Sequence, residues 1–271
     1  MILSELQEVN KGIIRNTQLD DVDYTDKRRT TSLVLDVETT IVMERDEQDK
    51  CPLPIFDIGY TISNVSREQM IIHRSYIIAD IFLDMSIMQN AHYFNKYPQY
   101  VLGLAKGTIE MITFNDFVKI LNEDIEKYNV KDMYAYNSKF DSAAIKGTNK
   151  FLNKLSELEY DIQCLWLASC QTYLKTQDFI QTAIINDWRS EKGNIKTSAE
   201  IAYRYISGNP DFVEAHTGLE DSIIETKILF HLKKFKKQAP TNQAPWKIVK
   251  DYAESLGYDL SPIEQPQEIV E

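Results

Sequence analysis

The chain has 271 residues, 43% of them hydrophobic, which is enough for one sizeable domain with extensions. No apolar run approaches the about 20 residues that cross a bilayer, and the segment around Glu5 and Glu8 lacks the features of a signal peptide. The net charge of −11 argues against broad coating of a phosphate backbone, but not against an enzyme whose acids collect metal ions locally.

The first half of the chain predicts a sheet that is built mainly from neighbouring strands. Residues 1–30 are polar and predict a loosely attached N-terminal arm. Strands are expected at 33–37, 55–63 and 70–78, and their close spacing favours a meander. Apolar residues then recur at helical spacing, which predicts a helix of about four turns; they are Phe114, Phe117, Val118, Leu121 and Ile125.

The second half alternates strands with helices. Strands are expected at 132–136 and 162–167, and helices from Ser142 onward, at 169–186, at 197–206 and from after His216 to about Lys237. This order predicts an α/β fold with a mixed five-stranded sheet flanked by helices. The predicted domains are the arm at 1–30, one main α/β domain at 31–238, and a tail at 239–271 with a short helix at 247–256. Cys51, Cys164 and Cys170 show no metal-ligand spacing, so we expect reduced thiols in a cytoplasmic protein.

Two acids stand in the first predicted strand. Side chains alternate along a strand, so Asp36 and Glu38 point to one face about 7 Å apart. Two ionised carboxylates in this position repel each other and resist burial unless a cation lies between them. For an isolated Asp-x-Glu pair, solvated acids at a strand end are the better interpretation.

Two later motifs add further candidates. Asn137 and Asp141 lie at a predicted strand-to-helix junction, where helix capping would also explain the aspartate. Thr217 and Glu220 fit a capping box at the start of the last strong helix. Asp221 then lies in the first turn and His216 just before it. Each motif alone favours a structural role.

Taken together, the three motifs resemble the DEDD superfamily of 3′→5′ exonucleases. Asp-x-Glu, Asn-x-x-Phe-Asp and His-x4-Asp agree with it in residue type, order and structural setting between Thr31 and Lys237. The histidine resembles that of the DEDDh branch, which includes the proofreading subunit of the bacterial replicative polymerase. The segment Lys196-Thr197-Ser198-Ala199-Glu200 is similar in sequence to phage-encoded members of the family.

The resemblance implies a ribonuclease H-like fold and two divalent ions, Mg²⁺ or Mn²⁺. Asp36, Glu38, Asp141 and Asp221 would be the metal ligands, with Asp36 bridging, and His216 would be the general base. The same carboxylates and His216 would form the catalytic set.

The resemblance also implies substrate contacts. Backbone groups near Thr39 and Thr40 would contact the terminal sugar, and Asn137 would hold the backbone or the scissile end of the substrate. Phe140 would contact substrate or, as the favoured alternative, pack the helix against the sheet. Two positions depart from the family pattern. Ile41 replaces a glycine after the first motif, and Gly218 replaces a common alanine, which would loosen the loop that carries His216.

The predicted activity is removal of 5′-mononucleotides from the 3′ end of single-stranded nucleic acid, with DNA favoured over RNA. An exoribonuclease and a catalytically silent nucleic-acid-binding protein are the alternatives. A polymerase or another replication protein is a candidate partner. We expect no association with a membrane. The aromatic segment 92–100 would form one wall of the cleft, or a packed loop with buried rings.

Overall fold

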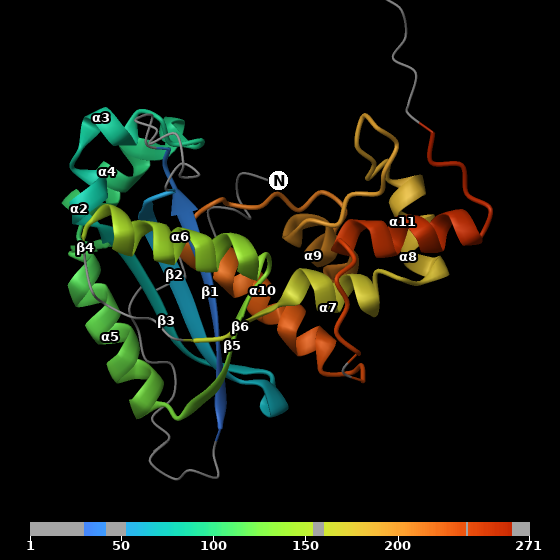
Figure 1. Ribbon diagram of the computed structural model, residues 1–271, viewed down its shortest axis with the longest axis horizontal. Coiled ribbons are helices and arrows are strands. Elements are labelled where there is room, and N and C mark those ends of the chain that lie inside the picture. Colours follow the sequence, from blue (N-terminus) through green and yellow to red (C-terminus); the bar gives the residue numbers. More distant parts are fainter. Residues whose placement is uncertain (1–29, 42–52, 154–159, 237, 262–271) are drawn as a thin grey trace, which may run out of the picture. The chain divides into compact units, whose positions relative to one another are not determined.

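The computed structural model describes residues 30–41, 53–153, 160–236 and 238–261 (Figure 1). The strands are β1 (Thr31–Thr39), β2 (Ile55–Asn64), β3 (Gln69–Ile78), β4 (Glu110–Ile112), β5 (Val130–Ala135) and β6 (Ile162–Cys164). The α-helices are α2 (Ala79–Phe82), α3 (Met85–Met88), α4 (Tyr97–Ala105), α5 (Phe114–Lys127), α6 (Ser138–Phe151), α7 (Leu165–Gln171), α8 (Gln177–Ile185), α9 (Ala199–Ser207), α10 (Gly218–Leu232) and α11 (Pro245–Ser255). Two 3₁₀ turns, η1 (Val65–Arg67) and η2 (Phe94–Lys96), complete the described elements.

The described residues divide into two compact units. The first holds the residues up to Gln163 together with Ala215–Thr226, and the second holds Cys164–Glu214 and the residues from Lys227 onward. Every predicted catalytic residue belongs to the first unit. The domain boundaries at residues 30/31 and 238/239 stay a prediction.

The sheet of the first unit has the strand order β4-β3-β2-β1-β5-β6. β2 runs antiparallel to both β1 and β3, whereas β1 pairs parallel with β5 and β3 pairs parallel with β4. A central β1 between an antiparallel meander and a parallel crossover strand is the arrangement of the ribonuclease H-like fold. The predicted α/β class and mixed sheet are confirmed.

The predicted number of five strands is wrong, because the described sheet has six. The additional strand, β4, has only three residues and is mostly exposed at the edge beside β3. A segment of three residues is too short to carry a period-two signal.

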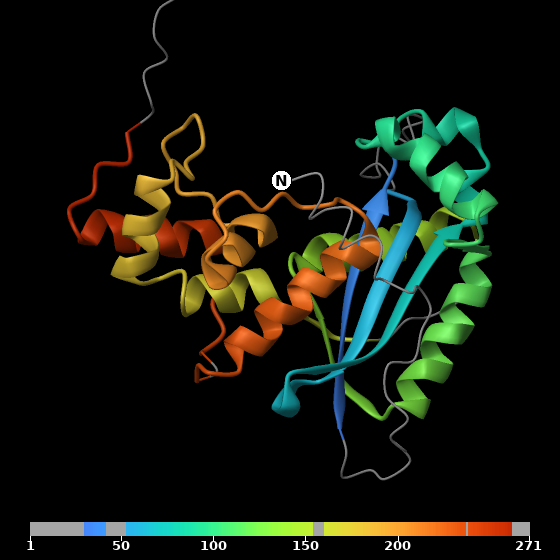
Figure 2. The same ribbon diagram turned by 180° about the vertical axis from the view of Figure 1, so that it is seen from behind.

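The two faces of the sheet differ in composition. Leu35 pairs with Tyr60 on one face, which α5 and α6 cover; the Tyr60 ring meets the Phe117 ring edge-on at 6.4 Å. Asp36 pairs with Gly59 on the other face, where Thr61 hydrogen-bonds Thr226 of α10. Accordingly α6 lies in front of the sheet in Figure 1, and α10 lies in front in the reverse view of Figure 2. The polar face is the one that carries the candidate site.

Several predicted elements are confirmed with small changes of boundary, and three are wrong in part. The strand expected at 162–167 ends at Cys164, whose thiol accepts a hydrogen bond from the Leu167 amide and starts α7. The helix expected at 169–186 is two helices, because Thr176 caps a new one by accepting from the Phe179 amide at 3.2 Å. The last strong helix ends at Leu232 rather than near Lys237.

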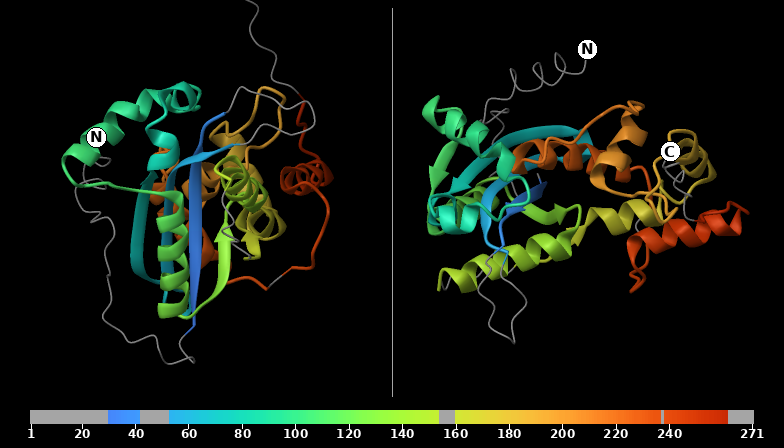
Figure 3. Two further views of the ribbon diagram at one scale, coloured as in Figure 1. Left: turned by 60° about the vertical axis from the view of Figure 1, so that its left-hand side comes forward. Right: turned by 90° about the horizontal axis from the view of Figure 1, so that it is seen from above.

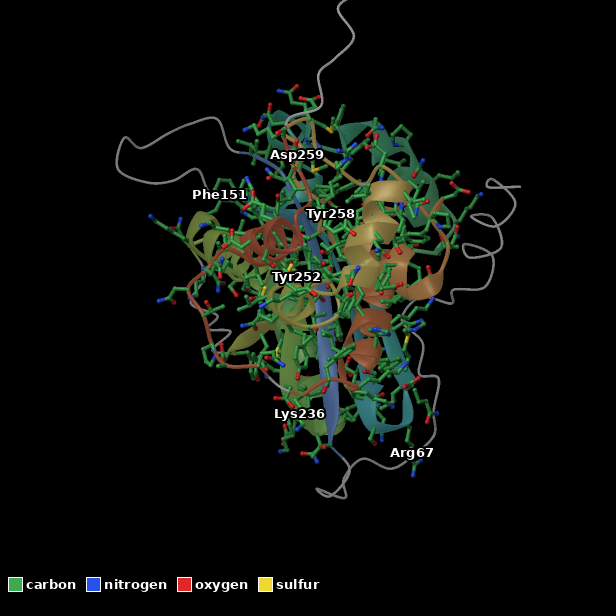
Figure 4. The ribbon with its side chains drawn as sticks, turned by 90° about the vertical axis from the view of Figure 1, so that its right-hand side faces the viewer. Arg67, Phe151, Lys236, Tyr252, Tyr258 and Asp259 are labelled. Carbon is green, nitrogen blue, oxygen red and sulfur yellow. The ribbon has the colours of Figure 1, made fainter. Side chains whose placement is uncertain are left out.

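The second unit is a set of helices that pack through aromatic rings. The Tyr173 ring lies 4.8 Å from the His231 ring, and Tyr205 donates a hydrogen bond to Asp178 at 2.6 Å. α11 packs on α7, and the ammonium of Lys175 lies 5.9 Å from the ring of Tyr252, which Figure 4 labels on α11.

Some predictions fall partly outside the described residues. The arm predicted at 1–30, Cys51, and the part of the tail beyond residue 261 all do. Cys164 and Cys170 are free thiols, as expected. Among the described helices, none combines the length and apolar character that a bilayer crossing demands.

Candidate active site

The first two acids lie near the carboxyl end of β1, the central strand. Asp36 and Glu38 share the polar face of the sheet, opposite Gly59 and Asp57 of β2. β1 ends at Thr39, which is half-buried, and the next residue, Thr40, is buried. The Thr40 hydroxyl donates to the carbonyl of Ile87 at 2.7 Å, so this side chain ties β1 to α3. Its predicted contact with a terminal sugar stays a prediction.

The start of α10 approaches the sheet more closely than any side chain would permit. A Cβ on Gly218 would lie 2.5 Å from the backbone nitrogen of Gly59, and a Cβ on Gly59 would lie 2.1 Å from that of Leu219. The Gly218 amide donates to the buried carboxylate of Asp57 at 3.0 Å. The expectation that Gly218 loosens the His216 loop is wrong, because this glycine lets the helix seat directly on β1 and β2.

Asp57 is a buried acid that the sequence motifs did not single out. It is 2% exposed, and besides the Gly218 amide it accepts a hydrogen bond from the Tyr100 hydroxyl at 2.8 Å. A carboxylate is favoured at a helix N-terminus, where unpaired amides and the helix dipole present positive charge. Asp57 therefore fixes the start of α10, and with it the helical turn that carries Asp221.

Asp141 comes from α6, on the opposite side of β1. It lies in the first turn of that helix and is buried. Asn137 precedes the helix as its N-cap, is exposed, and makes no capping hydrogen bond through its side chain. Phe140 is 38% exposed, so the expectation that it packs α6 against the sheet is wrong. The substrate roles of Asn137 and Phe140 stay predictions.

The structure brings three of the predicted residues into one cluster. Ligand atoms of Glu38, His216 and Asp221 all lie within 4.8 Å of one another. Glu38 comes from β1, His216 from the residues before α10, and Asp221 from the first turn of α10. Segments about 180 residues apart in the chain thus meet at one point.

Asp36 lies among the other acids of the site. Burial raises the pKa of its carboxyl group well above the usual range, and the negative charges of neighbouring acids raise it further. In order of decreasing effect these acids are Glu225, Asp221, Asp141 and Glu38. All four predicted metal ligands therefore share one electrostatic environment, although Asp36 and Asp141 lie outside the tight cluster of Glu38, His216 and Asp221.

Burial also raises the pKa of the Asp141 carboxyl group. Desolvation raises the pKa of its carboxyl group to about 7, against the opposite effect of hydrogen bonds with the backbone of Asp141 itself and of Val37. Asp36 and Asp141 therefore both have carboxyl groups with raised pKa values and lie near further acids. Their ionised forms are destabilised in this site.

Glu225 is a fifth acid of this site that sequence reasoning missed. It is 2% exposed, and its carboxylate accepts a hydrogen bond from the Tyr136 amide at 3.1 Å, next to Asn137. Its charge has the largest effect of any neighbour on the Asp36 carboxyl. The spacing from Asp221 is four residues, which places both acids on one face of α10, and this spacing was the available signal.

The predicted wall of the cleft also lies at the site. The Tyr93 ring stacks on the His216 imidazole, with centroids 4.4 Å apart and planes at 13°. Lys96 donates from its ammonium to the carbonyl of His216 at 3.1 Å and to that of Ala215. Burial lowers the pKa of Lys96, while Glu38 and Asp221 act in the opposite direction.

This donor set fits a divalent cation. Carboxylate oxygens are the ligands that Mg²⁺ and Mn²⁺ prefer, and like charges collected in one place are stabilised by a cation between them. The pKa of the Asp36 carboxyl is raised by burial and by neighbouring acids, and a cation among these acids would stabilise its ionised form. Asp36, Glu38, Asp141 and Asp221 are the residues that could hold the ions, and His216 lies in the cluster with Glu38 and Asp221.

Comparisons with known proteins gave matches among solved structures alone. No family model and no curated protein matches the chain. The chain is similar to the nuclease domain of 3′hExo, described as a DEDDh family member bound to rAMP, with 10% identity, a TM-score of 0.48, and coverage of 79% of this chain and 94% of that one.

Two further structures are similar to a comparable degree. A full-length 3′-exonuclease shares 12% identity, with a TM-score of 0.48 and coverage of 75% of this chain and 81% of that one. A 3′-exonuclease described in 3′-end-specific recognition of a histone mRNA stem-loop shares 13% identity, with a TM-score of 0.43 and coverage of 79% and 84%.

Proposed function

We propose that this protein is a metal-dependent 3′→5′ exonuclease that hydrolyses the terminal phosphodiester bond of single-stranded nucleic acid. One observation carries the proposal. Acids from β1, α6 and α10 surround Asp36, and the His216 imidazole lies within 4.8 Å of ligand atoms of Glu38 and Asp221. This arrangement of carboxylates beside one titratable base suits phosphodiester hydrolysis better than it suits a purely structural role.

The reaction requires a proton acceptor beside the attacking water. The water oxygen attacks phosphorus, the bond from phosphorus to the 3′-oxygen breaks, and a 5′-mononucleotide leaves with the phosphate. His216 would accept the proton that the water loses, a role suited to an imidazole because its pKa lies near neutrality. The 3′-oxygen that remains on the shortened strand takes a proton from solvent.

The carboxylates would hold the metal ions. Asp36, Glu38, Asp141 and Asp221 are the ligands, and Asp36 is the candidate for contact with both ions because every other acid of the set acts on it. When bound, two Mg²⁺ or Mn²⁺ ions supply Lewis-acid stabilisation of the attacking and leaving oxygens. Glu225 would hold the Tyr136 amide in place beneath this set.

The motifs and the exposed residues beside them favour a nucleic-acid 3′ end as the substrate. We take a DNA 3′ end as the first substrate, since the motifs resemble a proofreading exonuclease, and an RNA 3′ end as the second. The proposed substrate contacts are Thr39, Thr40, Asn137 and Phe140; the last two are exposed and accessible to a strand. Association with a polymerase or another replication protein is part of the proposal.

The activity is tested with 5′-labelled single-stranded DNA and RNA oligonucleotides in Mn²⁺ or in EDTA. We expect a ladder that shortens from the 3′ end in Mn²⁺ and is absent in EDTA. A circular single strand, which has no 3′ end, should remain intact. The Asp36→Asn variant is the matched control for a contaminating nuclease and should give no ladder.

The alternatives have distinct outcomes. A ladder on RNA alone assigns the protein as an exoribonuclease. Binding of either oligonucleotide with no ladder on both, under Mn²⁺ and Mg²⁺, contradicts the enzyme proposal and favours a catalytically silent binding protein.

A further inference from the structure

The His216 backbone adopts a conformation that is unusual for its residue type. Its φ is +50°, in the left-handed region that residues with a Cβ seldom occupy. His216 lies two residues before the first residue of α10, so this turn decides where the imidazole points relative to Glu38 and Asp221. A residue in such a conformation persists when its surroundings fix it.

Two residues from a distant segment contact His216 on different parts. The Tyr93 ring lies almost parallel to the imidazole, with centroids 4.4 Å apart. The Lys96 ammonium donates to the carbonyl of His216 at 3.1 Å and to the carbonyl of Ala215. One contact therefore fixes the plane of the ring, and the other fixes the backbone turn that carries it.

The two contacts are also joined to each other. The Lys96 ammonium lies 4.8 Å from the centre of the Tyr93 ring, on the ring face that attracts a cation. Tyr93 is the N-cap of the short turn η2 and Lys96 is its last residue, so one short segment carries both side chains. Both side chains are half-buried, and an ammonium with two of its three protons on carbonyls has little left for a substrate phosphate.

We propose that Tyr93 and Lys96 are positioning residues that hold the His216 imidazole at the place where it accepts the proton from water. This inference rests on the proposed nuclease function. Neither residue exchanges a proton or binds a metal. Tyr93 sets the plane of the imidazole, and Lys96 sets the backbone conformation of Ala215 and His216.

The kinetic experiment compares Lys96→Met with Lys96→Arg, and Tyr93→Leu with Tyr93→Phe. Misplacement of a catalytic group by a fraction of an ångström or more lowers turnover, so we expect kcat to fall by about tenfold to a hundredfold in Lys96→Met and Tyr93→Leu, with KM and the Mn²⁺ dependence unchanged. Lys96→Arg, which keeps the donors, and Tyr93→Phe, which keeps the stacked ring, should recover most of the activity. Lys106→Met, at the exposed end of α4, is the control for loss of a positive charge.

Two kinetic outcomes overturn the inference. A rise in KM at constant kcat in Lys96→Met would make Lys96 a substrate contact. Wild-type kcat in Tyr93→Leu would show that the stack does not position His216.

A second measurement is independent of nuclease activity. The chain has four histidines, so the ring proton resonances of His216 can be assigned in the metal-free protein by their loss in His216→Gln. A stacked tyrosine ring shifts these resonances upfield; we expect the shift in the parent and in Tyr93→Phe, and its loss in Tyr93→Leu. An unchanged resonance in Tyr93→Leu overturns the inference. An inactive parent that shows the shift would contradict the proposed nuclease function and leave the stacked arrangement established.

Discussion

Asp36 is the residue on which the other acids of the site act. Its carboxyl group is affected by Glu225, Asp221, Asp141 and Glu38, and each of them makes its ionised form less stable. Such a group is costly for the metal-free fold and useful for binding a cation. Changes at this position therefore separate activity from stability.

The variant Asp36→Asn tests that separation. We expect nuclease activity below detection, because the proposed bridging ligand is lost, and a melting temperature in EDTA no lower than that of the parent, because a crowded negative charge has been removed. Oligonucleotide cleavage and thermal unfolding are the two measurements, with Glu123→Gln on the exposed face of α5 as the control. A marked fall in melting temperature would assign Asp36 a structural role.

The raised pKa of Asp141 predicts a pH dependence of stability. The folded carboxyl group has a pKa of about 7 against 3.8 for the ordinary group, so between these values the folded state binds more protons than the unfolded state. The contribution of Asp141 to the free energy of unfolding is fully present below about pH 4 and is lost as the pH rises to about 7. In EDTA, the stability of the parent relative to Asp141→Asn should fall across this window. A difference that stays constant with pH would contradict the raised pKa.

Glu225 offers a paired comparison. Glu225→Gln keeps an oxygen for the Tyr136 amide and removes a charge beside Asp36, so we expect the metal-free variant to be at least as stable as the parent. Glu225→Ala leaves a buried amide without its acceptor and should lose about 1–3 kcal/mol. Denaturant unfolding of both variants in EDTA measures the difference. Equal destabilisation by Gln and Ala would show that the charge of Glu225 is not repelled by the site.

Site residues could be predicted from the sequence where they belong to short local motifs. Asp36 with Glu38, and His216 with Asp221, form such patterns, and the structure brings Glu38, His216 and Asp221 together. The contacts of Asp57 with the start of α10, and of Lys96 with the residues before it, could not be predicted, because they arise only when β2 and the segment before α4 pack there.

At the scale of elements, the seating of α10 on the sheet places half of the site. The backbones of Gly218 and Gly59 lie in close contact, and the Asp57 carboxylate accepts a hydrogen bond from the first amide of the helix. The right-hand view of Figure 3 shows α6 and α10 on opposite sides of the sheet, so Asp141 and Asp221 approach β1 from its two sides. The spacing between the acids therefore depends on how closely each helix packs.

Gly218→Ala tests this seating. The added methyl group would lie 2.5 Å from the Gly59 nitrogen and 3.0 Å from the Asp36 carbonyl oxygen, so the start of α10 must move away. We expect a loss of about 1–3 kcal/mol of unfolding free energy, as is typical of overpacking, together with a large fall in activity because Asp221 and His216 move with the helix. Denaturant unfolding and cleavage rates measure both effects. Parent-like stability and activity would show that the contact of α10 with β1 and β2 is not tight.

The elements themselves were predictable where the apolar pattern is long. The stripe along α5 and the buried runs of β2 and β3 were confirmed. Errors fell where three or four residues decide, as in β4 and at the cap of α7, since the local signal there is weaker than the tertiary contacts that override it.

At the scale of the whole molecule, the chain leaves the sheet unit after Gln163 and returns to it at Ala215. The third motif, His216 to Asp221, lies in the returning segment. Sequence order alone shows this motif only as the late part of one continuous domain. Part of the net charge of −11 lies in this unit. Its acids in or around β1 are Asp36, Glu38, Asp57, Asp141, Asp221 and Glu225.

Anomalous diffraction from crystals equilibrated with Mn²⁺ tests the central claim most directly. We predict two manganese peaks about 4 Å apart among the carboxylates of Asp36, Glu38, Asp141 and Asp221. Well-ordered acids with no manganese between them at saturating Mn²⁺, or manganese bound only elsewhere on the molecule, would contradict the account.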